Sequence, residues 1–321
     1  MVRDKSAVEV YDDDYGEKWF SDEASFQDDL VPVWGRRWSV SSEVGRLRAC
    51  LVRRPGKEIE CVKNPADWRW GDVMDPQKAR DQHDAFTQVY RDHGVDVFYV
   101  EEQREDRPNA IFMRDNLLGT PEGAIVCRQA TRFRRGEEAA VTRAVAKIGC
   151  PVVRTISGHG YFEGACAMWI DRRTIVLGTG VRANAEGVRQ VEEVLRPMGV
   201  ETVLPFQIPY GHAHLDGLMN PVDRRKLLIF PWQTPYDVID PLKRMGFELI
   251  EAPDVDEVKH GSSINLVALA PGLVVMPAGN PKTQRALEKA GVEVIPVDVS
   301  ELMKGYGSLH CMTAFLEREE I

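Results

Sequence analysis

One order of elements returns along this chain: a strand, a tight turn, a second strand, a helix and a third strand. In the first clear unit, residues 110–128 are expected to form a hairpin around Pro121-Glu122-Gly123, followed by a helix over 136–149 and a strand over 151–156. Three further units follow, over residues 165–208, 214–253 and 263–299. Since the residue identities hardly repeat, the shared order indicates a shared architecture.

A fifth unit requires both ends of the chain. The stretch from Cys311 to Glu317 would pair with residues 45–55, and a helix over 75–94 and a strand over 95–102 would complete the unit. Five units closed in this way predict an α/β fold, a five-fold pseudosymmetric propeller with its helices outside and the first hairpin strands around an axis. A doubly wound sheet is the competing architecture, but its strands would alternate singly with helices.

The propeller prediction sets the expected domain organisation. We expect residues 41–321 to form one catalytic domain. Residues 1–40, with three tryptophans and several acidic residues, lie outside the repeat and are expected to be an arm, a lid or a subunit contact. No low-complexity linker divides the chain.

The composition indicates the cellular location of the protein and excludes some classes of binding partner. No apolar run is long enough to cross a bilayer, and the first 20 residues lack the apolar core of a signal peptide, which predicts a cytoplasmic protein without a membrane partner. The net charge of −9 argues against nucleic acid as a partner. The six cysteines form no C-x-x-C pair, so most are expected to be buried thiols and not zinc ligands or disulfides.

Polar groups stand at equivalent positions of the units, in the first hairpin strand or in the turn just before it. They are Asp115, Glu163, His214 with Asp216, Asn265 and Cys311. If the units are equivalent, these groups converge on one axial pocket, and His214 and Asp216, two apart on a strand, point the same way. Each has a plain structural explanation when taken singly. Together, three carboxylates, an imidazole and a thiol are costly to bury without a purpose.

This set of groups suits a guanidino substrate. Carboxylates grip the planar guanidinium fork through paired hydrogen bonds, so Asp115 and Asp216 would hold it against Cys311. The thiolate, stabilised by the cationic substrate and a protonated His214, would attack the central carbon. His214 would protonate the departing amine and later take a proton from water, with Glu163 orienting the ring.

Four stretches, in order, resemble the guanidino-group-modifying superfamily of arginine deiminases, amidinotransferases and dimethylarginine dimethylaminohydrolases. The stretches "PNAIFMRD", "FEG", "HLD" and "HCMT" are similar to motifs of arginine deiminase, which the chain resembles most, without the helical insertion of that enzyme. The resemblance spans about Val44 to Glu317 and implies the five-unit propeller, or pentein. It also implies the roles already given to Asp115, Asp216, Glu163, His214 and Cys311.

The resemblance further implies how the rest of the substrate is bound. Asn109 and Arg182 stand where deiminases bind the α-carboxylate, which favours arginine or an arginine-like amino acid. Arg134 would add to this site or be a solvated residue of a basic turn. Ala165 and Cys166 replace the last two residues of the E-G-G-D turn, so the resemblance does not determine the identity of the guanidino substrate. No cofactor and no metal are implied.

The leading interpretation is a hydrolase that releases ammonia or an amine from a guanidino compound and leaves a ureido product. An amidinotransferase, in which an amine replaces water, would use the same residues. Metal-dependent hydrolysis is a different hypothesis, because His212 and His214 share a face and could join Cys311 or a carboxylate around an ion. A non-catalytic binding module is the third. Whether the protein forms a homo-oligomer is left open.

Overall fold

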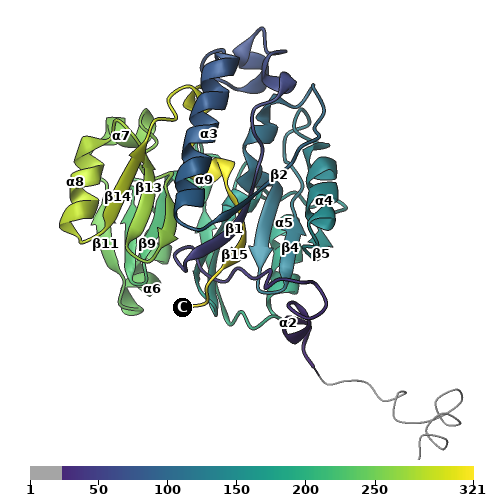
Figure 1. Cartoon of the computed structure of the whole chain (residues 1–321). Coiled ribbons are helices and arrows are strands. Elements are labelled where there is room, and N and C mark those ends of the chain that lie inside the picture. The colour runs from purple at the N-terminus through teal and green to yellow at the C-terminus, as the bar shows by residue number, and fades with distance from the viewer. Residues whose placement is uncertain (1–23) are drawn as a thin grey trace, which may run out of the picture.

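Five three-stranded sheets form a ring in the computed structural model, which describes residues 24–321 (Figure 1). In the first clear unit, β3 (Leu117–Thr120) pairs antiparallel with β4 (Gly123–Val126), which pairs in parallel with β5 (Val152–Thr155). Helix α4 (Glu137–Lys147) joins β4 to β5. The predicted order of elements, and with it the α/β propeller, is confirmed.

The next three units repeat this construction. They comprise β6 (Ala167–Asp171), β7 (Thr174–Thr179), α5 (Ala185–Leu195) and β8 (Thr202–Gln207); β9 (Met219–Asp223), β10 (Lys226–Ile229), α6 (Tyr236–Arg244) and β11 (Glu248–Glu251); and β12 (Val267–Ala270), β13 (Leu273–Pro277), α8 (Pro281–Lys289) and β14 (Glu293–Val297). The sequence did not predict the short α7 (Val255–Lys259), which Asp254 begins by accepting hydrogen bonds from two backbone amides.

The two ends of the chain complete the fifth sheet, as predicted. Strand β15 (Ala314–Arg318) pairs antiparallel with β1 (Leu47–Val52), and β1 pairs in parallel with β2 (Asp96–Tyr99). Helix α3 (Pro76–Asp92) lies between β1 and β2 in sequence and begins with an Asp75 cap and a proline in its first turn.

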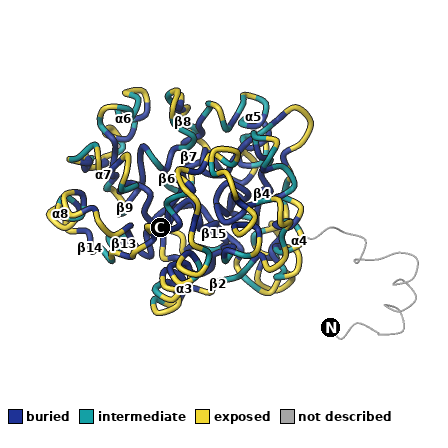
Figure 2. Tube along the Cα trace, turned by 90° about the horizontal axis from the view of Figure 1, so that it is seen from above, coloured by how far each residue is buried: buried dark blue, intermediate teal, exposed yellow. Residues whose placement is uncertain are grey.

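The closure is tight at Gly45, just before β1. A Cβ atom there would lie 1.9 Å from the carbonyl oxygen of Glu319, so only glycine fits. Seen from above, the strands form the buried centre of the ring, and the helices carry its exposed outer surface (Figure 2).

Short helical turns place polar residues directly in front of the first strand in four of the five units. These turns are the 3-10 helices η5 (Met113–Asn116), η6 (Gly164–Cys166) and η7 (Leu215–Gly217), and the one-turn helix α9 (Leu309–Met312). The expectation that His214 and Asp216 share a strand is therefore wrong, because β9 begins only at Met219. Cys311 likewise lies in α9 and not in the closing strand.

The described part of the N-terminal segment packs on the ring. Helix α2 (Phe26–Asp29) is followed by Arg36, which pairs with Asp96 and Glu317, and the Val40 amide donates to the carbonyl of Thr120. The expectation of an arm or lid for residues 1–23 falls outside the described residues. No helix in the described range is both long and apolar enough to span a membrane. All six cysteines are free and five are buried, as expected for most of them; Cys61 is exposed.

Candidate active site

Two cavities meet at Cys311. The small pocket has a volume of about 180 Å³, and its lining includes Trp68, Arg69, Asn109, Asp115, Arg134 and Arg182. The large cleft has a volume of about 690 Å³, and its lining includes His212, Asp216, Lys259, His260, Asn265 and Ser308. Both are lined by His214, Tyr306, Gly307 and Cys311, so the thiol and the imidazole stand where the two spaces join.

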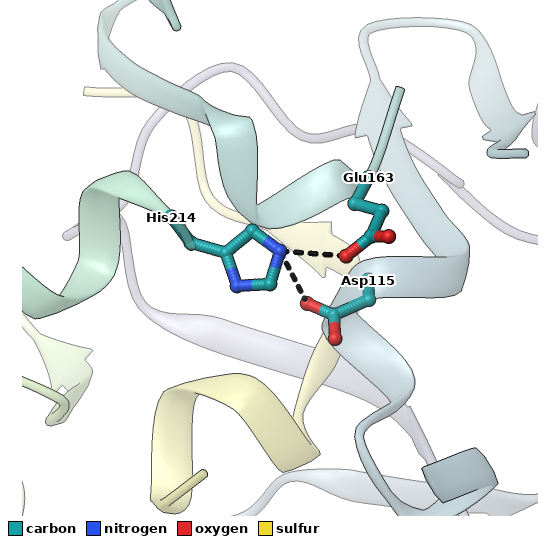
Figure 3. A group of neighbouring side chains, drawn as sticks. All are labelled: Asp115, Glu163 and His214. Atoms are coloured by element: carbon teal, nitrogen blue, oxygen red, sulfur yellow. Dashed lines mark hydrogen bonds and ion pairs between the residues drawn. The ribbon is translucent and has the colours of Figure 1, made fainter. Parts of the chain in front are cut away.

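The imidazole of His214 faces two carboxylates (Figure 3). Its Nε2 atom donates to Oε2 of Glu163 at 2.8 Å and lies 3.6 Å from Oδ1 of Asp115. Glu163 also accepts from the amide of Ala130 and from Arg182, at 3.0 and 3.1 Å. The two carboxylates come from η5 and the residue before η6, so equivalent turns bring them together.

These contacts determine which protonation states of His214 and Glu163 are favoured. Burial alone would lower the pKa of His214, but Asp115 and the hydrogen bond to Glu163 outweigh it and raise that pKa. Burial alone would raise the pKa of Glu163, but the hydrogen bond from His214 and the nearby Arg182 lower it to about 2. Both shifts favour a protonated imidazole beside an ionised glutamate.

Only one of the two carboxylate oxygens of Asp115 accepts a hydrogen bond from the described residues. Its Oδ2 atom accepts from Arg134 at 2.5 Å, whereas Oδ1 is buried and has no hydrogen-bond donor in the described part of the chain. An unpaired buried carboxylate oxygen costs free energy, so Oδ1 is suited to a ligand that brings a donor.

Asp216 and Asn265 hold Cys311 on its other side. The thiol donates to Oδ2 of Asp216 at 3.3 Å, and Nδ2 of Asn265 donates to the sulfur at 3.0 Å. Asp216 also accepts from Nδ1 of His310 at 2.9 Å. Burial, followed by the charges of Asp216 and Asp115, raises the pKa of the Cys311 thiol well above its ordinary value. The thiol is therefore protonated at neutral pH, and a cation beside the two aspartates would lower its pKa.

The residues expected to bind a carboxylate lie at the small pocket, although two already have partners. Arg182 pairs with Glu163, and Asn109 accepts from the indole of Trp70 at 2.6 Å while donating to the carbonyl of Trp68 at 3.1 Å. Arg134 is not a solvated turn residue, because it is only 4% exposed.

Sequence reasoning missed Glu43 and its partners. Glu43 is 2% exposed and accepts from Arg114 at 2.8 Å and from Nε2 of His310 at 3.4 Å. Burial opposes ionisation, but Arg114 and His310 lower the pKa of Glu43 to about 2. The available signal was an acidic residue inside the buried stretch "SVSSEVG". Arg69 was also missed, because its position depends on the conformation of a loop.

Asp115, Glu163 and His214 are also the group whose ligand atoms could reach one metal ion, since these atoms lie within 4.8 Å of one another. Their hydrogen bonds fit such an ion poorly. Both oxygens of Glu163 already accept hydrogen bonds, and the raised pKa of His214 opposes the neutral form that ligates metals. His212, the histidine expected in a metal site, is not in this group.

Comparison with known proteins agrees with this geometry. The family model described as "N,N dimethylarginine dimethylhydrolase, eukaryotic" matches residues 71–318. The uncharacterized protein YkgA of Bacillus subtilis is 27% identical over 292 residues, covering 90% of this chain and 99% of its own length. An arginine deiminase of Borrelia duttonii is 22% identical over 402 residues, covering 88% of this chain and 98% of the deiminase. That alignment is longer than this chain, as expected if the deiminase carries an insertion that is absent here.

A solved structure of a dimethylarginine dimethylaminohydrolase is also similar to this chain. A mutant of the dimethylarginine dimethylaminohydrolase of Pseudomonas aeruginosa, complexed with citrulline, superposes with a TM-score of 0.69 and 25% identity, covering 84% of this chain and 99% of that enzyme. The five-unit ring and the extent of the family match together give the assignment. The chain belongs to the N,N-dimethylarginine dimethylhydrolase family of the guanidino-group-modifying enzymes.

Proposed function

We propose that this protein hydrolyses arginine or an arginine-like guanidino compound through a covalent Cys311 adduct, releasing ammonia or an amine and leaving a ureido product. The observation that carries the proposal is the buried Oδ1 atom of Asp115, which accepts no hydrogen bond among the described residues and lies in the same pocket as the thiol and the imidazole. A guanidinium group supplies both the missing hydrogen-bond donor and a positive charge.

Substrate binding would activate the nucleophile. The guanidinium would lie between Asp115 and Asp216, and its charge would offset the two carboxylates that raise the pKa of Cys311. The thiol would then lose its proton to water in the large cleft that borders it, and the sulfur would bond to the central guanidinium carbon. Nδ2 of Asn265, 3.0 Å from the sulfur, would stabilise the thiolate.

His214 would serve both halves of the reaction. In the first, the protonated imidazole gives its proton to the departing nitrogen, the C–N bond breaks, and an amidino group remains on Cys311. In the second, neutral His214 takes a proton from water as the oxygen bonds to the same carbon, and the C–S bond breaks to release the ureido product and the thiolate. Glu163 supports this cycle by holding the ring at 2.8 Å.

The remainder of the substrate would occupy the small pocket. Arg182 lines it, and Asn109 retains one amide hydrogen beyond the bond to Trp68. Both are proposed to contact the α-carboxylate. The sequence similarity to arginine deiminase and the family match to dimethylarginine hydrolases support two related substrates, arginine and its N-methylated forms.

The test combines product analysis with trapping of the adduct. Purified protein would be incubated with arginine, methylated arginines and shorter guanidino compounds, and both ureido products and protein mass would be measured. We expect citrulline or a homologue from at least one compound and an amidino adduct on Cys311. Cys311→Ser should lower turnover by at least about a thousandfold. Turnover that survives this substitution but is lost with a chelator would support the metal hypothesis instead.

The large cleft favours one second candidate, amidino transfer. A space of about 690 Å³ beside the sulfur could admit an amine acceptor in place of water. The same incubations with added amines distinguish the two reactions, because transfer produces ornithine and an amidinated amine without citrulline.

A further inference from the structure

The two aspartates beside Cys311 are held in the same way. Oδ2 of Asp115 accepts from Arg134 at 2.5 Å, and Oδ2 of Asp216 accepts from Nδ1 of His310 at 2.9 Å. The Oδ1 atom of each aspartate accepts no hydrogen bond among the described residues. Each carboxylate is therefore fixed by one oxygen, and its other oxygen remains available to a ligand.

The two groups that fix the aspartates each contact a glutamate as well. Arg134 donates to Glu137 at 2.8 Å, and Nε2 of His310 lies 3.4 Å from Oε2 of Glu43. Arg134 is 4% exposed and His310 is 1% exposed, so both lie in the interior. The site thus contains the same construction twice: an aspartate, a buried basic side chain and a buried glutamate.

The contact between His310 and Glu43 requires one hydrogen, which belongs to the imidazole or to the carboxyl group. Oε1 of Glu43 already accepts from Arg114 at 2.8 Å and from the backbone amide of Trp169 at 3.2 Å. These two donors and the charge of Arg114 favour an ionised carboxylate, which assigns the hydrogen to Nε2 of His310. Because Nδ1 needs a second hydrogen to donate to Asp216, a neutral ring with one N–H cannot serve both contacts.

We infer that His310 is a protonated positioning residue, which keeps Asp216 ionised and oriented for the cationic group of the substrate as Arg134 does for Asp115. The inference rests on the proposed function, because it needs a guanidinium group at the two aspartates. A guanidinium has N–H groups on both sides of its carbon and can donate to both free Oδ1 atoms. His310 lines neither cavity at Cys311, so it acts through Asp216 and not by touching the substrate.

The protonated ring also explains why a buried carboxylate can stay charged beside the thiol. A carboxylate removed from water and left without a partner takes up a proton, and a neutral carboxyl group no longer attracts a cation. The groups that act on Asp216 from its surroundings are His310, His214 and Cys311. Of these, His310 makes the shortest hydrogen bond to the carboxylate, so its removal should weaken the binding of a cation specifically.

Binding of arginine and of citrulline tests this role, because the two ligands differ in a charged guanidinium and a neutral ureido group. Calorimetry would be carried out on the Cys311→Ser protein, with and without a second substitution at His310. His310→Phe removes both donors and keeps an aromatic ring beside Phe315. We expect it to weaken arginine binding by about 10- to 100-fold, as for one lost charge-assisted hydrogen bond, and citrulline binding at least about tenfold less.

Two further substitutions at His310 and one control complete the binding experiment. His310→Asn keeps a donor close to the position of Nδ1 and should recover part of the arginine affinity. His310→Gln extends its amide toward Glu43 and should recover less. His83→Phe, at another buried histidine that lines neither cavity, is the matched control and should change neither affinity.

Nuclear magnetic resonance of protein with isotopically labelled histidine ring nitrogens tests the charge without any ligand. The signals of His310 are those lost in His310→Asn, and both ring nitrogens should carry hydrogen at pH 7.5. A ring nitrogen without hydrogen would overturn the inference. Equal losses of arginine and citrulline binding in His310→Phe, or no loss of either, would also overturn it.

The outcomes separate this inference from the proposed reaction. A selective loss of arginine binding in His310→Phe would support the role of His310 even if the wild-type protein turned over no substrate. Wild-type turnover together with unselective losses would refute the role of His310 and leave the reaction standing. Failure of arginine to bind the Cys311→Ser protein would contradict both.

Discussion

The side-chain amide of Asn265 contacts Cys311 at both of its polar ends. Nδ2 donates to the sulfur at 3.0 Å, and Oδ1 accepts from the backbone amide of Cys311 at 3.2 Å. The same oxygen accepts from the amide of His310 at 3.0 Å. One residue just before β12 thus fixes the start of α9 and the position of the thiol.

Replacing Asn265 with aspartate keeps the shape and reverses the interaction with sulfur. A carboxylate cannot donate to the thiolate, and its charge adds to those of Asp115 and Asp216. We expect Asn265→Asp to lower kcat at least about tenfold and to slow alkylation of Cys311 by iodoacetamide at neutral pH. An alkylation rate at or above that of the wild type would contradict this role. Asn220→Asp, a buried residue near β12 that bonds only to carbonyls, controls for stability.

The pair of His214 and Glu163 predicts a pH dependence. Because the pKa of His214 is raised above its ordinary value, the protonated form that the proposed first half-reaction needs persists to higher pH than in an ordinary histidine and is lost as pH rises through that raised pKa. The kcat/KM profile should fall on its alkaline side. Glu163→Gln removes one carboxylate, so the fall should begin at lower pH and kcat/KM should drop about tenfold or more. An unchanged profile would refute this assignment, and Glu192→Gln on the outer surface of α5 is the matched control.

His83 predicts acid sensitivity of the fold. This residue of α3 is 0% exposed, neither ring nitrogen has a hydrogen-bond partner among the described residues, and burial lowers its pKa to about 3. Since the unfolded chain protonates near pH 6.5 and the folded chain only near 3, the free energy of unfolding should decrease as pH falls between these values, by up to about 1.4 kcal/mol per unit.

Urea denaturation at pH 7.5 and pH 5 checks this effect. The His83→Leu variant should lose less stability between the two pH values than the wild type, because leucine carries no titrating group. His159→Leu, at an exposed histidine, should follow the wild type. If His83→Leu also follows the wild type, another group causes the acid sensitivity.

Replacing Glu43 should lower the free energy of unfolding substantially. Glu43→Gln would leave the guanidinium of Arg114, which is 0% exposed, without its carboxylate partner. Breaking a buried pair in this way costs about 3–5 kcal/mol, which denaturant unfolding would measure. Glu101→Gln breaks an ion pair with Lys147 that is more than two-thirds exposed on both sides and should change stability little. A small effect of Glu43→Gln would show that the network around His310 rearranges.

The sequence allowed the five units and most of the site to be predicted, because each polar group recurs just before the first strand of a unit. Periodicity could not separate the turn at Asp216 or α9 at Cys311 from a strand, since a few apolar residues fit either structure. Glu43 precedes the first strand of the chain and reaches the site only through tertiary packing. Arg69 depends on a left-handed backbone angle that no residue pattern encodes.

The pairing of β15 with β1 also determines the stage of protein synthesis at which the candidate site can first be complete. Arg318 donates to the carbonyl of Gly45, 273 residues earlier in the chain. During synthesis, the first strand emerges from the ribosome long before its partner exists, and the turn bearing the sulfur emerges almost together with that partner. A nascent chain can therefore gather its carboxylates and imidazole before Cys311 has been synthesised, and the candidate site stays incomplete until that turn emerges. A contact of such long range also predicts slow final closure after release.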